Sequence, residues 1–158
     1  MKYIIMGVAG SGKSSVGRAL ARKINYTFIE GDDLHSNENK LKMSRGVHLT
    51  DNDRVPWLKK INKLLRSPDE NIIVSCSALK KEYRSILNDK INDVTYIFLT
   101  ILPSLAEERV KNRSEHFFSP SLIYSQFRLL EPPENAIIVD ASLTVDQIVK
   151  IVINKTGL

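Results

Sequence analysis

Short apolar segments alternate with longer amphipathic segments along this chain of 158 residues. Such alternation is typical of a parallel β-sheet whose strands are joined by helices. The apolar segments predict five strands, at residues 3–6, 26–29, 71–76, 94–99 and 136–139. Apolar residues at helical spacing predict helices at residues 14–24 and 145–153, with a further helix after Pro103. The pattern therefore predicts an α/β fold with a five-stranded parallel sheet flanked by helices.

Two segments interrupt this alternation. Residues 31–68 predict two helices with no strand between them, and residues 114–133 begin polar, become aromatic and end in Pro132-Pro133. In a five-stranded sheet these are natural places for an inserted helical segment that binds a substrate and for a lid that closes over it. We expect both segments to be mobile parts of a single domain that spans residues 1–158.

The composition is that of an ordinary folded domain. Hydrophobic residues make up 42% of the chain and charged residues 26%, which argues against disorder and against a coiled coil. No apolar run approaches the roughly 18 residues of a membrane span, and the first residues carry too short an apolar stretch for a secretory signal. The single cysteine, Cys76, excludes an internal disulfide framework. We therefore expect a soluble, cytoplasmic protein without a membrane partner.

The charge balance is basic, with 23 Lys and Arg residues against 18 Asp and Glu and a formal net charge of +5. Proteins that bind nucleic acids are often basic, but they tend to gather the charge in one stripe or tail. Here basic residues are scattered among acidic ones. The distribution favours a small enzyme that handles anionic substrates over a nucleic-acid-binding protein.

The strongest chemical signal is a glycine-rich segment between the first predicted strand and the first predicted helix. Residues 7–14 fit the pattern G-x-x-x-x-G-K-[ST] at every fixed position. They are Gly7, Val8, Ala9, Gly10, Ser11, Gly12, Lys13 and Ser14. The glycines let successive N–H groups point at phosphate oxygens, and the helix N-terminus adds partial positive charge. Lys13 can then reach the β- and γ-phosphates and Ser14 can ligate Mg²⁺, so the motif predicts binding of a nucleoside triphosphate.

The remaining sequence favours a kinase of small molecules over other phosphate-loop proteins. A GTPase would carry Asp-x-x-Gly and Asn-Lys-x-Asp, and neither pattern occurs in the chain. The chain is also short for a motor or transporter ATPase. Small phosphate-loop proteins with two inserted segments are usually kinases, and ATP with Mg²⁺ is the expected donor.

Candidate groups for a phosphoryl acceptor lie at the ends of the second and third strands. Glu30 and Asp32, two residues apart, would point to one face of a strand, so that one can orient the acceptor hydroxyl and the other can hold Mg²⁺ through water. The third strand ends without an aspartate, and Ser77 and Lys80 would face the ligand at its junction with the next helix.

Two arginines and three histidines complete the candidate groups. Arg109 and Arg113, spaced i, i+4 on the helix after Pro103, would clamp phosphate beside the lid. The three histidines have no spacing typical of a metal site, which makes zinc improbable.

Several further stretches carry a pattern more specific than the phosphate loop. They are Gly31-Asp32-Asp33-Leu34-His35, Asp53-Arg54-Val55-Pro56-Trp57-Leu58, Cys76-Ser77-Ala78-Leu79-Lys80, His116-Phe117-Phe118 and Ser125-Gln126-Phe127. In this order behind a phosphate loop, they resemble the gluconokinase family of small sugar-acid kinases over residues 3–140. The resemblance implies a P-loop kinase fold and transfer of the γ-phosphate of ATP to the 6-hydroxyl of D-gluconate. It also suggests a homodimer.

The resemblance assigns roles to matching positions. It implies Lys13, Asp32 and Arg113 as catalytic residues, with Asp32 as the base that orients the acceptor hydroxyl. It also implies contacts to the sugar acid, from Asp32, His35, Arg54, Ser77, Lys80, Arg84 and His116. Either Arg54 or Arg84 could pair with the substrate carboxylate. Ser36 and His48 stand where the family frequently has proline, and Asn52 stands where it often has an acidic residue.

Two alternatives remain at the level of the sequence. One is a kinase of another small acid such as shikimate, or of a nucleoside monophosphate, although shikimate kinases typically carry a run of glycines where this chain has residues 77–80. The other is a nucleotide-binding regulatory or RNA-binding module, which would have no need of Lys13, Asp32 and the lid arginines together.

Overall fold

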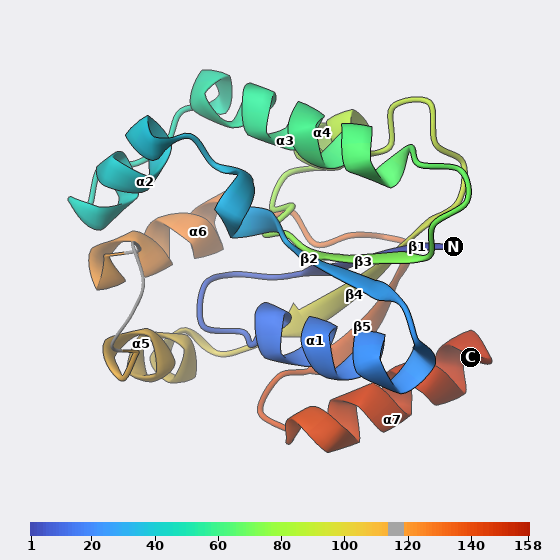
Figure 1. Ribbon diagram of the computed structural model, residues 1–158. Coiled ribbons are helices and arrows are strands. Elements are labelled where there is room, and N and C mark those ends of the chain that lie inside the picture. Colours follow the sequence, from blue (N-terminus) through green and yellow to red (C-terminus); the bar gives the residue numbers. More distant parts are fainter. Residues whose placement is uncertain (114–118) are drawn as a thin grey trace.

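In the computed structural model, which describes residues 1–113 and 119–158, a single parallel sheet lies between two layers of helices (Figure 1). The strands are β1 (Lys2–Met6), β2 (Thr27–Glu30), β3 (Ile72–Ser75), β4 (Val94–Thr100) and β5 (Ala136–Asp140). Their order in the sheet is β2-β3-β1-β4-β5, and every neighbouring pair is parallel. The predicted strands are confirmed, each within about one residue at either end.

The helices are assigned to the two faces by the alternation of apolar side chains along the strands. On β1, Ile4 and Met6 pack toward α3 (Asp51–Leu65) and α4 (Lys81–Leu87). Tyr3 and Ile5 point to the other face, where α1 (Lys13–Ile24) and α7 (Val145–Thr156) cover them. Because successive strand residues point to opposite faces, each of these buried strands contributes to two cores.

The first interruption of the pattern folds as a helical insertion, as predicted. A 3₁₀ turn, η1 (Gly31–Leu34), leads into α2 (Asn37–Ser44) and then α3, with no strand between them. Ser36 caps α2 by accepting a hydrogen bond from the Asn39 N–H at 3.1 Å. Thr50 and Asp53 form a reciprocal capping box at the start of α3. These caps fix the residue at which each helix begins and so help to position the side chains that the insertion presents.

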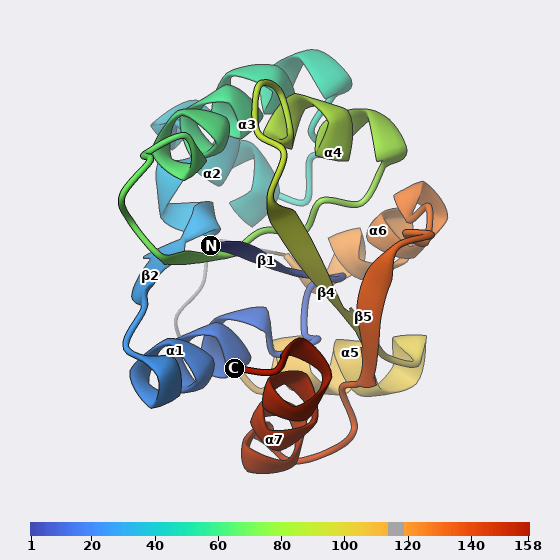
Figure 2. The same ribbon diagram turned by 90° about the vertical axis from the view of Figure 1, so that its right-hand side faces the viewer.

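The second interruption lies against the first. Beyond α5 (Pro103–Lys111), the described chain resumes with η2 (Pro120–Leu122) and α6 (Ile123–Leu129). Met43, Leu49 and Leu122 form a small buried cluster, and the Ser119 N–H donates to the Met43 carbonyl at 3.1 Å. Figure 1 shows α6 at the end of the sheet to which the strands run, and Figure 2 shows the sheet between α3 and α4 on one face and α1 and α7 on the other. The two interruptions therefore cover the same edge of the sheet, while their mobility stays a prediction.

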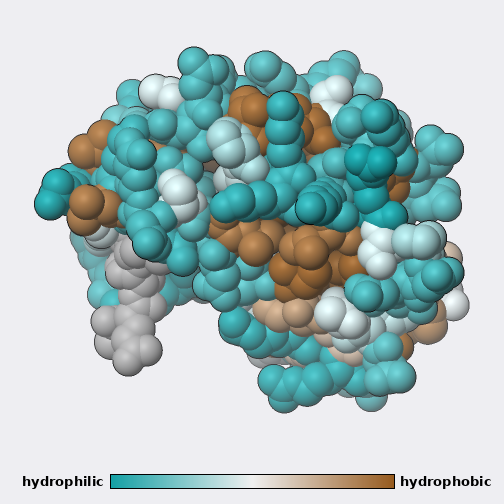
Figure 3. All heavy atoms as spheres, turned by 45° about the horizontal axis from the view of Figure 1, so that its top comes forward, coloured by the Kyte–Doolittle hydropathy of each residue, from teal (hydrophilic) through white to brown (hydrophobic). Residues whose placement is uncertain are grey.

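The face that carries the insertion is mainly hydrophilic, with one apolar groove. Figure 3 shows apolar residues gathered below α3, and the groove there lies beside edge strand β2. Its apolar lining includes Ile29, Leu34, Leu64 and Ile72. Among the described residues, no helix combines the length and hydrophobicity that crossing a membrane requires.

Candidate active site

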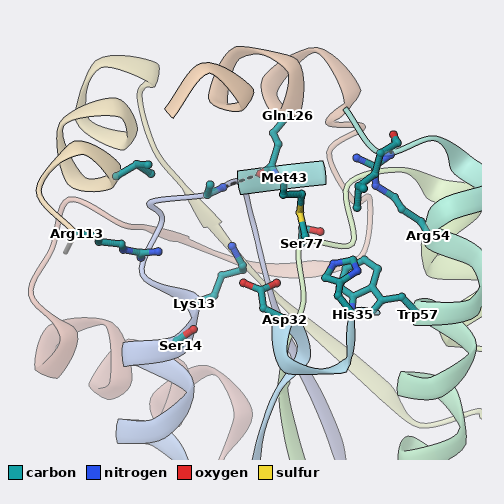
Figure 4. A pocket seen from close by; sticks show the side chains of 13 residues that line it. Lys13, Ser14, Asp32, His35, Met43, Arg54, Trp57, Ser77, Arg113 and Gln126 are labelled. Carbon is teal, nitrogen blue, oxygen red and sulfur yellow. Dashed lines mark hydrogen bonds between the residues drawn. The ribbon is translucent and has the colours of Figure 1, made fainter. Parts of the chain in front are cut away.

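A cavity opens at the carboxyl ends of the strands, where ligands bind in open α/β sheets. It is a recess that stays open to solvent at its mouth. The phosphate loop contributes Ala9, Lys13 and Ser14, and the remaining side chains come from the insertion, from the loop after β3 and from α5 and α6. They are Asp32, His35, Met43, Leu49, Arg54, Trp57, Ser77, Val110, Arg113 and Gln126 (Figure 4).

The phosphate loop is shaped by backbone conformations that favour glycine. Gly10 and Gly12 have φ angles of +82° and +89°, in the left-handed region that other residues rarely adopt. A Cβ on Gly10 would also approach the Ala106 carbonyl oxygen to 2.6 Å, so α5 packs directly on the loop. The Lys13 ammonium donates to the Val8 carbonyl at 3.0 Å. The loop thus presents the start of α1 and the Lys13 side chain to the cavity.

Asp32 reaches the cavity from η1 and not from a strand. The sequence predicted that Glu30 and Asp32 would share a strand face, but β2 ends at Glu30. Gly31 packs so closely on β3 that a Cβ there would collide with the Ser75 carbonyl oxygen, and the chain turns into η1. Glu30 instead accepts a hydrogen bond from Ser75 Oγ and pairs with Arg18 at 3.3 Å. The turn directs only Asp32 toward Lys13 in the cavity (Figure 4).

Lys13 and Asp32 form a coupled pair of opposite charges in a poorly hydrated place. Burial raises the pKa of the Asp32 carboxyl above its ordinary value, although the positive charge of Lys13 opposes the rise. Burial likewise lowers the pKa of Lys13, while Asp32 opposes that change and Arg113 adds to it. Desolvation dominates in both groups. A carboxylate so placed is a better proton acceptor than an aspartate in water.

The insertion side of the cavity is built from stacked and hydrogen-bonded side chains. The His35 ring stacks on Trp57 with ring centroids 3.9 Å apart and an interplanar angle of 18°. Trp57 Nε1 donates to the Gly31 carbonyl at 2.7 Å, which links the stack to the turn that carries Asp32. One guanidinium nitrogen of Arg54 donates to the Leu49 carbonyl at 2.6 Å and to the Tyr83 hydroxyl at 3.2 Å. Arg54 therefore has a fixed position at the cavity wall.

A second hollow lies on the other side of the phosphate loop. Gly10, Gly12 and Ser15 line it together with Arg109, Arg113 and apolar residues near α7. Arg109 donates to the Gly10 carbonyl at 3.3 Å and to the Ala141 carbonyl at 2.8 Å. Because Arg113 lines both hollows, the phosphate loop with Arg113 separates one binding space from the other.

Comparisons with known proteins identify the family. The family model for shikimate kinase matches residues 9–132. A probable gluconokinase of Dictyostelium discoideum is 39% identical, over 96% of this chain and 84% of its own. The thermosensitive gluconokinase of Escherichia coli K12 is 40% identical, over 84% of this chain and 72% of its own. The chain belongs to the gluconokinase family.

Solved structures separate the family from the wider fold. The crystal structure of a gluconokinase from Sinorhizobium meliloti 1021 is 42% identical and has a TM-score of 0.89, covering 99% of this chain and 91% of that one. A shikimate kinase from Bacteroides thetaiotaomicron covers 100% of this chain and 99% of its own with a TM-score of 0.71, but only 17% of residues are identical. The shikimate kinase shares the fold, whereas the gluconokinase also shares much of the sequence.

Most residues predicted for the gluconokinase site lie around the main cavity. Those that line it are Ala9, Lys13, Ser14, Asp32, His35, Arg54, Ser77 and Arg113. Arg109 lines the second hollow beside Gly10, Ser11 and Gly12. The i, i+4 argument for the two arginines needs correction, because α5 ends at Lys111 and Arg113 follows the helix. The prediction for His116 lies outside the described residues.

Two predicted contacts are not brought to the cavity. The Lys80 ammonium pairs with the Asp51 carboxylate at 3.1 Å and lies over the Tyr83 ring. The Arg84 guanidinium donates to three carbonyls, those of Ala78, Leu79 and Glu131, at 2.8–3.2 Å. Both side chains are held by neighbouring protein groups, so we do not carry them into the proposal below.

Other cavity residues were not predicted. Gln126 lines the cavity and its side-chain oxygen accepts a hydrogen bond from the Ala9 N–H at 2.7 Å (Figure 4). Trp57 is buried in the core, and its ring also supports His35. Cys76 is fully buried, and burial raises the pKa of its thiol to about 12, which keeps it neutral. The stretch Ser125-Gln126-Phe127 contributed to the resemblance, but it gave Gln126 no role, because the hydrogen-bond partner of Gln126 is 117 residues away.

Proposed function

We propose that this protein transfers the γ-phosphate of ATP to the 6-hydroxyl of D-gluconate, giving 6-phospho-D-gluconate and ADP. The observation that carries the proposal is the meeting of Lys13, Asp32 and Arg54 in one cavity of a gluconokinase-family chain. The phosphate loop suits the donor, the aspartate suits a hydroxyl that must lose a proton, and the arginine suits a carboxylate. We call the Asp32, His35 and Arg54 wall the acceptor side.

The donor would enter from the second hollow. Its polar wall is the phosphate loop with Arg109, and its apolar wall is formed by Leu143, Val145 and Ile148. Backbone N–H groups at the start of α1 suit phosphate oxygens, and an apolar wall suits the face of a nucleobase. In this arrangement the terminal phosphate points past Lys13 toward the acceptor side.

Mg²⁺ fits the oxygen groups present at the phosphate loop. The Ser14 hydroxyl and the Asp32 carboxylate line the same cavity, and both offer the hard oxygen ligands that this ion prefers. Residues 1–113 and 119–158 contain no group of three His, Cys, Asp or Glu side chains that could hold a metal ion. Ser14 would therefore hold the ion together with phosphate oxygens, and the bound ion supplies positive charge at the phosphates.

The acceptor side supports a defined transfer step. The 6-hydroxyl oxygen attacks the γ-phosphorus, a new P–O bond forms, and the bond from the γ-phosphorus to the bridging oxygen of ADP breaks. Asp32 accepts the proton that the hydroxyl loses, as its raised pKa favours. Lys13 and Arg113 stabilise the charge that spreads over the transferring phosphoryl group. Arg54, set by its two hydrogen bonds, would pair with the gluconate carboxylate.

The proposal is tested by ADP release from ATP and Mg²⁺ with a panel of acceptors. D-gluconate, other sugar acids, shikimate and nucleoside monophosphates are presented in parallel, and the product is identified by mass and by NMR. We expect strong stimulation by gluconate and phosphorylation at its 6-hydroxyl. Stimulation by shikimate or by a nucleoside monophosphate, with none by gluconate, would keep the kinase and overturn the substrate.

A further inference from the structure

The Asn39 side chain, on α2, connects His35 to the first turn of α3. Its amide nitrogen donates to the Asp53 carbonyl at 2.9 Å and lies 3.3 Å from Nδ1 of His35. A backbone carbonyl can only accept, so the group of Asn39 that faces it is the NH₂ and not the oxygen. The second hydrogen of that NH₂ is then directed at His35 Nδ1. Asn39 is itself buried, and the Ser36 cap holds its backbone N–H.

This contact determines the protonation of the His35 ring. An Nδ1 that accepts a hydrogen bond carries no proton, so the proton of a neutral imidazole is on Nε2. The ring stays neutral because burial, together with the positive charges of Arg54, Lys40 and Lys60, lowers the pKa of His35 to about 3. Stacking on Trp57 fixes the plane of the ring.

The Nε2–H group is available to a ligand. His35 lines the cavity, where Figure 4 shows its ring between Asp32 and Trp57. In the described part of the chain, no protein group accepts a hydrogen bond from this nitrogen. The ring can therefore donate to an oxygen of a bound molecule, but it cannot accept a proton there.

We propose that Asn39 is a positioning residue that holds His35 in its Nε2–H tautomer, so that the acceptor side presents a neutral hydrogen-bond donor to a substrate oxygen. The two polar groups of this wall then have separate tasks. Asp32 accepts the proton of the reacting hydroxyl, and His35 recognises an oxygen elsewhere on the acceptor. The identity of that acceptor, gluconate, rests on the proposed function, whereas the tautomer does not.

The tautomer is measured directly on the wild-type protein without any substrate. Nitrogen NMR of ¹⁵N-histidine-labelled protein distinguishes a protonated ring nitrogen from an unprotonated one, and His35→Gln identifies the His35 signals. We expect one neutral ring protonated at Nε2, unchanged between about pH 5 and 8, where an ordinary histidine titrates. A ring protonated at Nδ1, or one that titrates in this range, would overturn the proposal.

The effect on the acceptor is measured with Asn39→Asp. The new carboxylate accepts from Nδ1, draws the proton to it and removes the donor at Nε2. We expect the KM for gluconate to rise about tenfold, which corresponds to about 1.4 kcal/mol, with an unchanged KM for ATP and a His35 signal shifted to the Nδ1–H form. An unchanged KM for gluconate beside a shifted tautomer would contradict the role of the donor.

Asn62→Asp is the matched control. Asn62 is as buried as Asn39, at 6% exposure, and its amide also donates to two acceptors, the Leu87 and Asp89 carbonyls at 2.9 Å. Both substitutions place a carboxylate against a carbonyl, so a similar loss of stability is expected from each. If the two variants raise the KM for gluconate equally, the effect is structural and the proposal fails.

A second pair of variants keeps the test valid if Asn39→Asp does not fold. His35→Gln retains a neutral N–H donor at about the same reach, whereas His35→Leu has none. We expect the glutamine to keep the KM for gluconate within about threefold and the leucine to raise it about tenfold. Equal effects of the two variants would contradict recognition by donation. If the wild-type enzyme uses no gluconate, the proposed function fails, and the nitrogen spectrum still decides the tautomer.

Discussion

The two sides of the cavity are constructed in different ways. We call the phosphate loop, residues 7–14, the nucleotide side. It is largely backbone, because one contiguous loop with glycines at positive φ presents the N-terminus of α1 and Lys13. The acceptor side is made of side chains from η1, from the residue that follows it and from α3, and partners distant in the sequence hold His35 and Arg54 in place. A backbone site can serve any nucleoside triphosphate, whereas a side-chain site can be altered residue by residue. We therefore expect substrate choice to reside on the acceptor side.

The largest expected effect comes from Lys13, the side chain through which the nucleotide side contacts the phosphates. Lys13→Ala removes the charge that faces the β- and γ-phosphates, and we expect turnover to fall by more than about 10³-fold. Turnover is measured by ADP release at saturating gluconate. Lys80→Ala is the control, since Lys80 pairs with Asp51 away from the cavity, and its turnover should stay within about threefold of wild type. A large loss of turnover in Lys80→Ala would show that Lys80 contributes to the site after all.

The next largest effect is expected from the base. Asp32→Asn keeps the size of the side chain but cannot accept a proton, so the kcat should fall by on the order of 10²-fold while ATP binding persists. Because burial raises the pKa of Asp32, the wild-type kcat should decline with falling pH at a higher pH than for an ordinary aspartate. The variant should lack that decline. Near-full turnover by Asp32→Asn would contradict the assignment of the base.

The same substitution has a predictable effect on stability. A folded-state pKa above the unfolded value means that the ionised Asp32 opposes folding, and this cost is present at every pH above the raised pKa. Asp32→Asn removes the ionised form, so its thermal midpoint at neutral pH should be higher than that of the wild type. Calorimetry at neutral pH measures the difference, and a lower midpoint would show that Asp32 contributes to folding through its charge.

The sequence predicts the nucleotide side of the cavity better than the acceptor side. The five strands and the phosphate loop could be found because their signals are local, in apolar runs and in one motif of eight residues. Glu30 and Asp32 were misjudged because the chain turns into η1 directly after Glu30, where Gly31 packs against the carbonyl of Ser75. Strand periodicity cannot show such a close approach between strands 44 residues apart.

The acceptor side was predicted as a set of residues but not as an arrangement. The resemblance named Arg54 and Arg84 alike, and only the structure separates them. Arg84 is held by three carbonyls, while Arg54 lines the cavity. The Asn39–His35 contact, which joins the cap of one helix to a stacked ring, has no motif of its own. Hydrogen-bond partners of this kind follow from packing and cannot be read from spacing.

A pair of arginine variants sharpens this distinction. Arg54→Lys keeps the charge but loses the planar fork that suits a carboxylate, and we expect the KM for gluconate to rise on the order of tenfold. Arg84→Lys should leave that KM unchanged and lower the stability by about 1–3 kcal/mol, because buried carbonyls lose their donors. Kinetics and thermal unfolding are measured on both variants. An increased KM for Arg84→Lys in a folded protein would reverse the assignment of the two arginines.

The smallest effect is expected at Gln126, which connects the phosphate loop to α6. Gln126 in α6 accepts from the Ala9 N–H of the phosphate loop, so Gln126→Ala frees that peptide and removes one hydrogen bond worth about 1 kcal/mol. We expect the kcat to fall about threefold to tenfold with little change in the KM for gluconate. Gln147→Ala is the matched control, since Gln147 likewise accepts from a backbone N–H, that of Thr144 at 3.0 Å, but at the start of α7. A change in the KM for gluconate without a change in kcat would contradict this role. Gln126 would then belong to the acceptor side, and α6 would contribute to binding of the acceptor.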